Sequence, residues 1–257
     1  MEKRSGNLWD LIRVALSFLT ERRRARRSVE LPQVVNRVLT QEKAVALTFD
    51  ADLTPKMESA MRSGRTWCDK SILDILEHYR VPATFFLSGK WALMHPREME
   101  RISANKLFEI GNHGYSHAGF SAFSGQSPRF YSEDTIDEEE VMSAEKLLSK
   151  YPSFRRFFRF PSMTLSRARV AFVRRLGYFV VEGDINRPAA HEKNPRVLAK
   201  RIAKGFAPGS IIALHLHGAP LAPSTGLALP DLIARAQKKG YRFAKLSDLF
   251  KLGAPQS

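Results

Sequence analysis

Ionisable side chains recur in this sequence at the points where short apolar runs end. The run that ends at Phe49 is followed by Asp50 and Asp52, and a later apolar run leads to His113 and His117. Histidines four residues apart place two imidazoles on one side of a helical turn, where both can bind one cation. Two histidines at this spacing can also be ordinary surface residues, so by itself the pair is a candidate cation site.

Three more ionisable residues follow later apolar runs in the same way: Arg159, Asp184 and His215. Each type of residue has a structural explanation when taken alone, because an Asp-x-Asp can cap a loop, an arginine can form a buried ion pair and a histidine can be satisfied in a core. Ionisable groups that converge on one cleft cost desolvation energy, however, and such costs are typical of functional sites. We therefore interpret the whole set as one site.

The apolar runs themselves are predicted β-strands, and amphipathic segments between them are predicted helices. The predicted strands are Ala44–Phe49, Ala83–Leu87, Leu107–Gly111, Arg156–Phe160, Tyr178–Glu182, Ser210–His215 and Tyr241–Leu246. The predicted helices are Asp69–Arg80, Lys90–Ser103, Asp137–Lys150, Ser166–Leu176, Pro195–Gly205 and Leu227–Lys239. This alternation indicates an α/β fold with parallel strands joined by right-handed crossovers.

The position of the ionisable residues agrees with that fold class. They lie at the carboxyl ends of the predicted strands, where α/β sheets and barrels build their sites. Seven strands can close as a barrel or stay open as a doubly wound sheet, and the periodicity alone leaves both open. The sequence shows no internal repeat or low-complexity linker, so we expect one domain after the head of the chain.

Composition narrows the class of protein. The 257 residues are 44% hydrophobic, enough for a buried core, and the formal net charge is +15. Such a surplus attracts anionic partners without choosing among nucleic acid, membrane and acidic wall polymer. We find no helix-turn-helix, zinc-finger or RNA-binding motif, and expect no nucleic-acid partner. The single cysteine, Cys68, excludes an internal disulfide and a thiolate metal cluster.

Residues 1–40 are predicted to be a basic, helical N-terminal extension to a domain over residues 41–257. The apolar stretch Leu8–Leu19 is interrupted by Asp10 and Arg13, so it does not match a secretory signal. We favour a solvated extension over a helix that lies on a membrane surface. The rest of the chain contains no apolar stretch of membrane-spanning length. Compartment and oligomeric state stay open.

Five segments resemble, in order, the motifs of the polysaccharide deacetylase family, the NodB-homology carbohydrate esterases that include chitin and peptidoglycan deacetylases. These segments are Leu47–Asp52, Val81–Leu87, Glu109–His117, Phe158–Pro161 and Gly209–His215. The resemblance spans roughly Ala44 to Phe250. It implies a distorted (β/α) barrel of about seven parallel strands. It also implies a metal-dependent hydrolase that removes acetyl groups from N- or O-acetylated carbohydrate, such as a cell-wall or extracellular polysaccharide.

The same resemblance implies a role for each matching residue. Asp52, His113 and His117 resemble the metal ligands, a set that suits Zn²⁺, Co²⁺ or a similar divalent transition metal. Asp50 resembles the catalytic base and Arg159 the arginine that positions it. His215 resembles the general acid and Asp184 the carboxylate that orients it. The main-chain N–H of Ser162 falls where the family stabilises an oxyanion.

The sequence also departs from the family pattern. Ala51 separates two aspartates that are usually adjacent, and the loop Leu53–Lys70 is longer than expected. Gly114 replaces a usual Ser or Thr, and Ser162-Met163 replaces a usual aromatic and Gly. Ala213 stands where Leu often lines the acetyl methyl pocket. His217 shares a strand face with His215 and is an alternative general acid.

Two alternative functions stay open, and one acidic run has two interpretations. Asp50, Asp52 and Thr54 also match the first motif of haloacid-dehalogenase-type phosphatases, with Mg²⁺ as cofactor and Asp184 as a late metal-binding acid. That interpretation leaves the histidines and Arg159 unexplained. The second alternative, motivated by the net charge, is a non-catalytic barrel that binds an anionic polymer. The acidic run Glu133–Glu140 is expected to be a helix N-terminus rather than a metal site.

Overall fold

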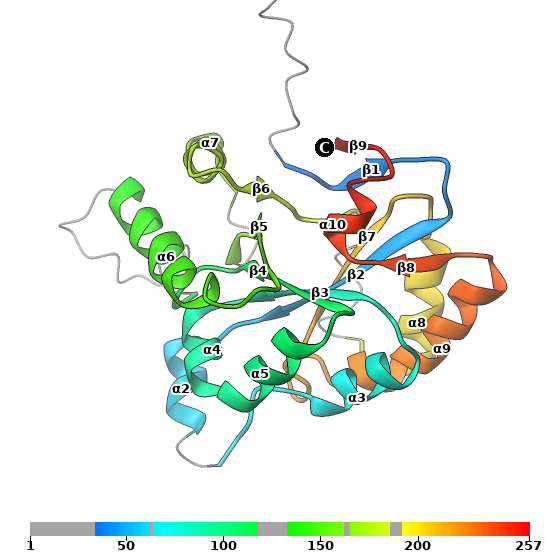
Figure 1. Cartoon of the computed structure of the whole chain (residues 1–257). Coiled ribbons are helices and arrows are strands. Elements are labelled where there is room, and N and C mark those ends of the chain that lie inside the picture. Colours follow the sequence, from blue (N-terminus) through cyan, green and yellow to red (C-terminus); the bar gives the residue numbers. More distant parts are fainter. Residues whose placement is uncertain (1–33, 62–63, 118–132, 162–164, 186–191) are drawn as a thin grey trace, which may run out of the picture. The chain divides into compact units, whose positions relative to one another are not determined.

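The computed structural model describes residues 34–61, 64–117, 133–161, 165–185 and 192–257. The chain divides into two compact units, Met1–Pro32 and Gln33–Ser257, and all the described residues belong to the second. That unit is built on a curved parallel sheet in the order β6-β5-β4-β3-β2-β7, with β8 also paired to β2 (Figure 1). Its strands are β2 (Ala44–Ala51), β3 (Ala83–Leu87), β4 (Phe108–Asn112), β5 (Phe154–Phe158), β6 (Phe179–Val180), β7 (Ile211–His215) and β8 (Arg242–Ala244).

The sheet closes on itself through the segment that follows β6. β6 pairs with β5 at one edge, and Ile185, five residues later, forms a parallel bridge with Ile212 of β7 at the other edge. The N–H of Ala213 donates to the carbonyl of Ile185 at 2.9 Å. Gly183, with φ 113°, permits the crossing, because a side chain there would collide with the main-chain oxygen of Ile211. The fold is therefore the predicted distorted barrel, and not an open doubly wound sheet.

The two faces of β2 have different neighbours, because side chains alternate along a strand. Leu47, Phe49 and Ala51 pack in the core beneath the helices. Thr48 and Asp50 face the opposite way, into the barrel, and are buried as well. Every residue of β2 is buried, which explains its nearly continuous apolar sequence.

Helices cover the outside of the sheet, and Figure 1 shows α3, α5, α8 and α9 together along one side. The helices are α2 (Pro55–Met61), α3 (Lys70–His78), α4 (Gly89–Met94), α5 (Pro96–Ala104), α6 (Glu133–Leu148), α7 (Arg167–Arg175), α8 (Pro195–Lys204), α9 (Thr225–Lys238) and α10 (Leu246–Leu249). The helix predicted over Lys90–Ser103 is two helices, α4 and α5. Pro96 starts the second, since proline lacks the N–H that would continue the first.

A two-stranded antiparallel sheet joins the two ends of the described chain. β1 (Arg37–Leu39) pairs with β9 (Ala254–Gln256), and Val38 of β1 is buried, as is Val35 just before the strand. The folded unit thus begins near residue 33, earlier than the expected boundary at residue 40. Residues 1–33, which make up most of the predicted helical extension, lie outside the described residues. No helix in the described residues is long and apolar enough to cross a membrane.

Candidate active site

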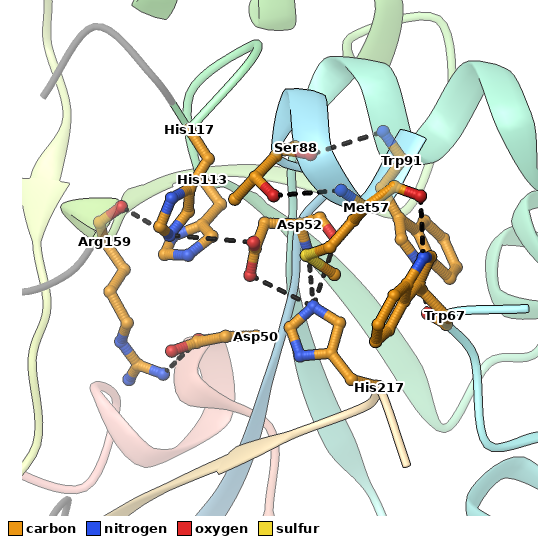
Figure 2. Close-up of polar contacts among 11 residues, drawn as sticks. Asp50, Asp52, Met57, Trp67, Ser88, Trp91, His113, His117, Arg159 and His217 are labelled. Carbon is orange, nitrogen blue, oxygen red and sulfur yellow. Dashed lines mark hydrogen bonds and ion pairs between the residues drawn. The ribbon is translucent and has the colours of Figure 1, made fainter. Parts of the chain in front are cut away.

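The carboxyl end of β2 carries an aspartate that is paired with a buried arginine. Asp50 Oδ1 accepts a hydrogen bond from Arg159 Nη1 at 2.8 Å (Figure 2). The same guanidinium donates to Thr48 Oγ1 at 2.8 Å and to the carbonyl of Val181 at 3.1 Å, and lies 4.1 Å from the ring centre of Phe86. Burial raises the pKa of Asp50, but the guanidinium and two nearby histidines outweigh it and hold the pKa below its usual value. Asp50 is therefore ionised at neutral pH.

Two residues beyond Asp50, a carboxylate and two imidazoles come together. Asp52, His113 and His117 each offer one ligand atom, and these atoms lie within 4.8 Å of one another. Asp52 Oδ2 lies 3.7 Å from His117 Nε2. His113 Nδ1 lies 2.9 Å from the carbonyl oxygen of Arg159, so Nδ1 carries the proton and Nε2 is left to face a cation. Burial lowers the pKa of His113 to about 4, which keeps it in the neutral, metal-binding form. This donor set fits a zinc-like ion.

The turn that carries the two histidines is held by Glu140 of α6. The Glu140 carboxylate accepts from the N–H groups of Tyr115 and Ser116 at 2.8 and 2.7 Å, and also from the Ser116 hydroxyl. The turn needs this support because His117 has φ 59°, a left-handed conformation uncommon for a residue with a side chain. Sequence reasoning missed Glu140, since it lies inside the acidic run interpreted as a helix N-terminus.

The last strand, β7, brings two histidines alongside the two aspartates. His215 is the register partner of Asp50, and it is partly buried. His217 lies two residues further on, with Nε2 3.1 Å from Asp52 Oδ1. The two imidazole rings stack with their centres 5.7 Å apart. Each histidine therefore faces a different aspartate. That arrangement favours His215 over His217 as the group that acts together with Asp50.

The structure does not bring Asp184 to His215, which corrects the expected role of Asp184. Its carboxylate accepts from the Ser210 hydroxyl at 2.8 Å and from the Ile211 N–H at 2.9 Å, at the beginning of β7. His215 ends that strand, about 13 Å further along. The turn at Gly183 is the physical reason, because it takes the chain to the near end of β7. The same placement removes the late acidic residue that the phosphatase interpretation needs.

A second buried carboxylate, not foreseen from the sequence, lies near the Asp50–Arg159 pair. Glu182 is 4% exposed, and its Oε1 has no hydrogen-bond partner among the described residues. Burial raises the pKa of Glu182 to about 7. The charge of Asp50 adds to this rise, whereas the charge of Arg159 and a hydrogen bond from the Phe160 backbone oppose it. The only sequence signal was a glutamate at the end of a predicted strand.

Met57 and Trp67 of the long loop Leu53–Lys70 lie beside Asp52 (Figure 2). It contains α2, and the Trp67 indole N–H donates to the Met57 carbonyl at 2.9 Å. Trp91 of α4 in turn donates to the Trp67 carbonyl at 3.0 Å, so the loop is tied to the barrel (Figure 2). Ser162 and Met163, with the predicted oxyanion N–H, lie outside the described residues.

The chain is similar in sequence to known deacetylases. The chain is 25% identical over 219 residues to a peptidoglycan-N-acetylglucosamine deacetylase of Bacillus cereus, covering 83% of this chain and 91% of that protein. It is 27% identical to a chitooligosaccharide deacetylase of Rhizobium leguminosarum bv. trifolii, covering 83% and 85% of the two chains.

Solved structures share the fold. The Bc1960 peptidoglycan N-acetylglucosamine deacetylase matches with a TM-score of 0.69 at 22% identity, covering 87% of this chain and 95% of that one. A family 4 pseudoenzyme from Bacillus anthracis matches with a TM-score of 0.64 at 22% identity, covering 85% and 69%, so the fold by itself does not establish activity. A cobalt-bound acetyl xylan esterase from Clostridium thermocellum matches with a TM-score of 0.62 at 26% identity, covering 82% and 91%.

The family assignment rests on the match to a family model. The model described as polysaccharide deacetylase matches residues 37–181, which is more than half of the chain. The matched range contains Asp50, Asp52, both histidines of the turn and Arg159. The chain therefore belongs to the polysaccharide deacetylase family.

Proposed function

We propose that this protein removes N-acetyl groups from a cell-wall carbohydrate with the help of a divalent transition metal such as Zn²⁺ or Co²⁺. One observation carries the proposal. An aspartate kept ionised by a buried arginine lies next to an Asp-His-His set whose donor atoms are close enough to share one cation. A base beside a Lewis acid is the combination that hydrolysis of an unactivated amide requires.

The metal would be held by Asp52, His113 and His117. When bound, it supplies Lewis acidity, which polarises a carbonyl and makes water easier to deprotonate. The protein prepares each ligand for this task. Asp52 has a pKa below its usual value because contacts from histidines outweigh its burial, and His113 is neutral with one nitrogen already bound to a carbonyl.

The chain's own residues would manage the protons. Asp50 takes a proton from the attacking water, and Arg159 keeps Asp50 ionised and in place through the 2.8 Å contact. His215 gives a proton to the departing amine nitrogen of the sugar, so the bond between carbonyl carbon and nitrogen breaks and acetate is released. Burial lowers the pKa of His215, while the charge of Asp50 opposes that effect. Activity should therefore fall as the pH rises through the pKa of His215.

The substrate is inferred from the relatives and the charge. The named relatives act on peptidoglycan N-acetylglucosamine and on chitooligosaccharide. The formal net charge of +15 favours an anionic polymer over neutral chitin, because a basic surface raises the local concentration of polyanions. We therefore propose peptidoglycan-type N-acetylglucosamine as the substrate. Turnover that falls as salt is added would support this choice, and salt-independent turnover would contradict it.

The test is acetate release from peptidoglycan and from N-acetylglucosamine oligomers. Metal-stripped protein is compared with protein reloaded with Zn²⁺ or Co²⁺, and with the Asp50→Asn variant. Asp74→Asn is the matched control, because Asp74 is exposed on α3. We expect release only from reloaded protein, with Asp50→Asn at least about 100-fold slower and Asp74→Asn unchanged. Metal binding without release from either substrate would contradict the proposed activity.

A further inference from the structure

The carboxylate of Asp52 has two oxygens with different neighbours. Oδ2 lies 3.7 Å from His117 Nε2, on the side of the cation site. Oδ1 lies 3.1 Å from His217 Nε2 (Figure 2). The side chains of Asp52 and His217 are only 8% and 2% exposed, so water does not compete for this contact. The motifs that identify the family end at His215 and do not include this histidine.

The position of the proton on His217 follows from its surroundings. Nε2 lies 3.1 Å from Asp52 Oδ1 and 3.1 Å from the main-chain oxygen of Asp52, and both are acceptors. The N–H of Asp52 is also 3.1 Å away and would suit the other tautomer. That tautomer would place a proton on Nδ1, which is buried and has no partner among the described residues. A buried donor without an acceptor is costly, so the proton belongs on Nε2.

From this geometry we propose that His217 is a positioning residue for the metal carboxylate. It donates Nε2–H to Asp52 Oδ1 and thereby turns Oδ2 toward the cation. The inference rests on the proposed metal-dependent function. His113 is oriented in a parallel way, because the carbonyl of Arg159 binds its Nδ1 and leaves Nε2 for the metal. Two of the three ligands are thus each fixed through the atom that does not face the cation.

The spacing of the sequence agrees with this role. Asp50 pairs in register with His215, and two residues further along each strand Asp52 meets His217. Ala51, which separates two aspartates that are usually adjacent, is therefore matched by Leu216, which separates two histidines. The pairing continues between these positions, since the N–H of Leu216 donates to the carbonyl of Asp50 at 2.9 Å.

A role for His217 as a fourth ligand is disfavoured. In the described part of the chain, the group whose donor atoms lie close enough to share one ion consists of Asp52, His113 and His117. His217 is outside that group, and its Nε2 is directed at oxygens of Asp52. A residue that supports a ligand without touching the metal typically changes metal affinity 10- to 100-fold, approximately, when it is replaced.

The experiment measures Zn²⁺ affinity of the metal-stripped full chain by competition with a chromogenic chelator. His217→Leu keeps the bulk of the side chain and removes the donor, whereas His217→Gln retains an N–H donor. His215→Gln is the matched control on the same strand face, facing Asp50. We expect affinity to fall about 10- to 100-fold in His217→Leu, by less in His217→Gln, and not in His215→Gln.

Several outcomes would overturn the inference. Equal affinity in the unaltered protein and His217→Leu would sink it while leaving the proposed function standing. A change in the visible absorption bands of the Co²⁺-loaded His217→Gln variant would show His217 to be a ligand instead. If circular dichroism shows that His217→Leu does not fold, His217→Gln becomes the deciding variant. A fall in the Zn²⁺ affinity of His217→Gln by more than about 100-fold would count against the proposal. Failure of the unaltered protein to bind any metal would overturn both proposals.

Discussion

Replacing Glu182 with Gln should stabilise this protein at and above neutral pH. In the folded protein, burial raises the pKa of Glu182 from 4.5 to about 7. Between these pH values the folded state holds a proton that the unfolded state has released, so the free energy of unfolding falls as the pH rises. The two values differ by about 2.5 pH units, and each unit corresponds to about 1.4 kcal/mol, so the loss approaches about 3–4 kcal/mol well above pH 7.

The assay is urea unfolding of both proteins at pH 5 and pH 8. At pH 5, close to the unfolded-state pKa of 4.5, only a small part of this loss has developed. The free energy of unfolding of the variant should therefore exceed that of the original by less than about 1 kcal/mol. At pH 8 it should gain about 3 kcal/mol. Glu139→Gln is the control for the same change of side chain at an exposed position of α6.

A gain that is the same at pH 5 and pH 8 would refute the reasoning, because it would mean that Glu182 does not titrate between them. A variant that is less stable than the original at pH 8 would refute it more strongly. That result would show the ionised carboxylate to be stabilised by Arg159 rather than strained by burial and by Asp50.

Three further predictions concern positions that support the site. Glu140→Ala should weaken Zn²⁺ binding about 10-fold or more, measured by chelator competition, because it frees the turn that carries the histidines; unchanged affinity would contradict this role. Asp184→Ala should lower the free energy of unfolding by about 1–3 kcal/mol, since the Ile211 N–H loses its acceptor, yet leave kcat/KM for acetate release within about threefold; a large fall in kcat/KM would restore the catalytic role expected from the sequence. Gly209→Ala should lower Tm far more than Gly64→Ala. Both glycines have positive φ, but only a side chain at Gly209 would collide with a main-chain oxygen of β1. Equal losses in Tm would show that the left-handed backbone conformation, and not the collision, determines the loss of stability.

The part of the fold that the sequence predicts best is the central parallel sheet. The buried strands are short apolar runs, and their carboxyl ends meet at one edge for any parallel arrangement. Residues that follow different strands, such as Asp50, His113 and Arg159, could therefore be expected to converge, and the structure brings them together. The family and the barrel predicted from the motifs are confirmed by the comparisons.

The features that escaped prediction depend on contacts between segments far apart in the chain. Asp184 follows a predicted strand, but a left-handed glycine beside it carries the chain across to β7, and a linear pattern does not reveal such a crossing. Glu140 looks like any acidic residue near a helix start until α6 lies against the histidine turn. β1 and β9 are three residues each and pair across the whole chain, so neither has a periodicity to detect.

The alignment of β2 with β7 has a consequence for how the site can fail. Asp50 and Asp52 lie on one face of their segment, and His215 and His217 lie on the facing side of the other. Side chains alternate with a period of two, so a slip of one residue between these segments would turn a whole pair away from its partners. Partial misalignment would thus abolish the base, the acid and the metal carboxylate together. The backbone hydrogen bonds between β2 and β7 therefore both stabilise the barrel and set which catalytic side chains face each other. Insertions or deletions in these two strands should be far less tolerated than substitutions.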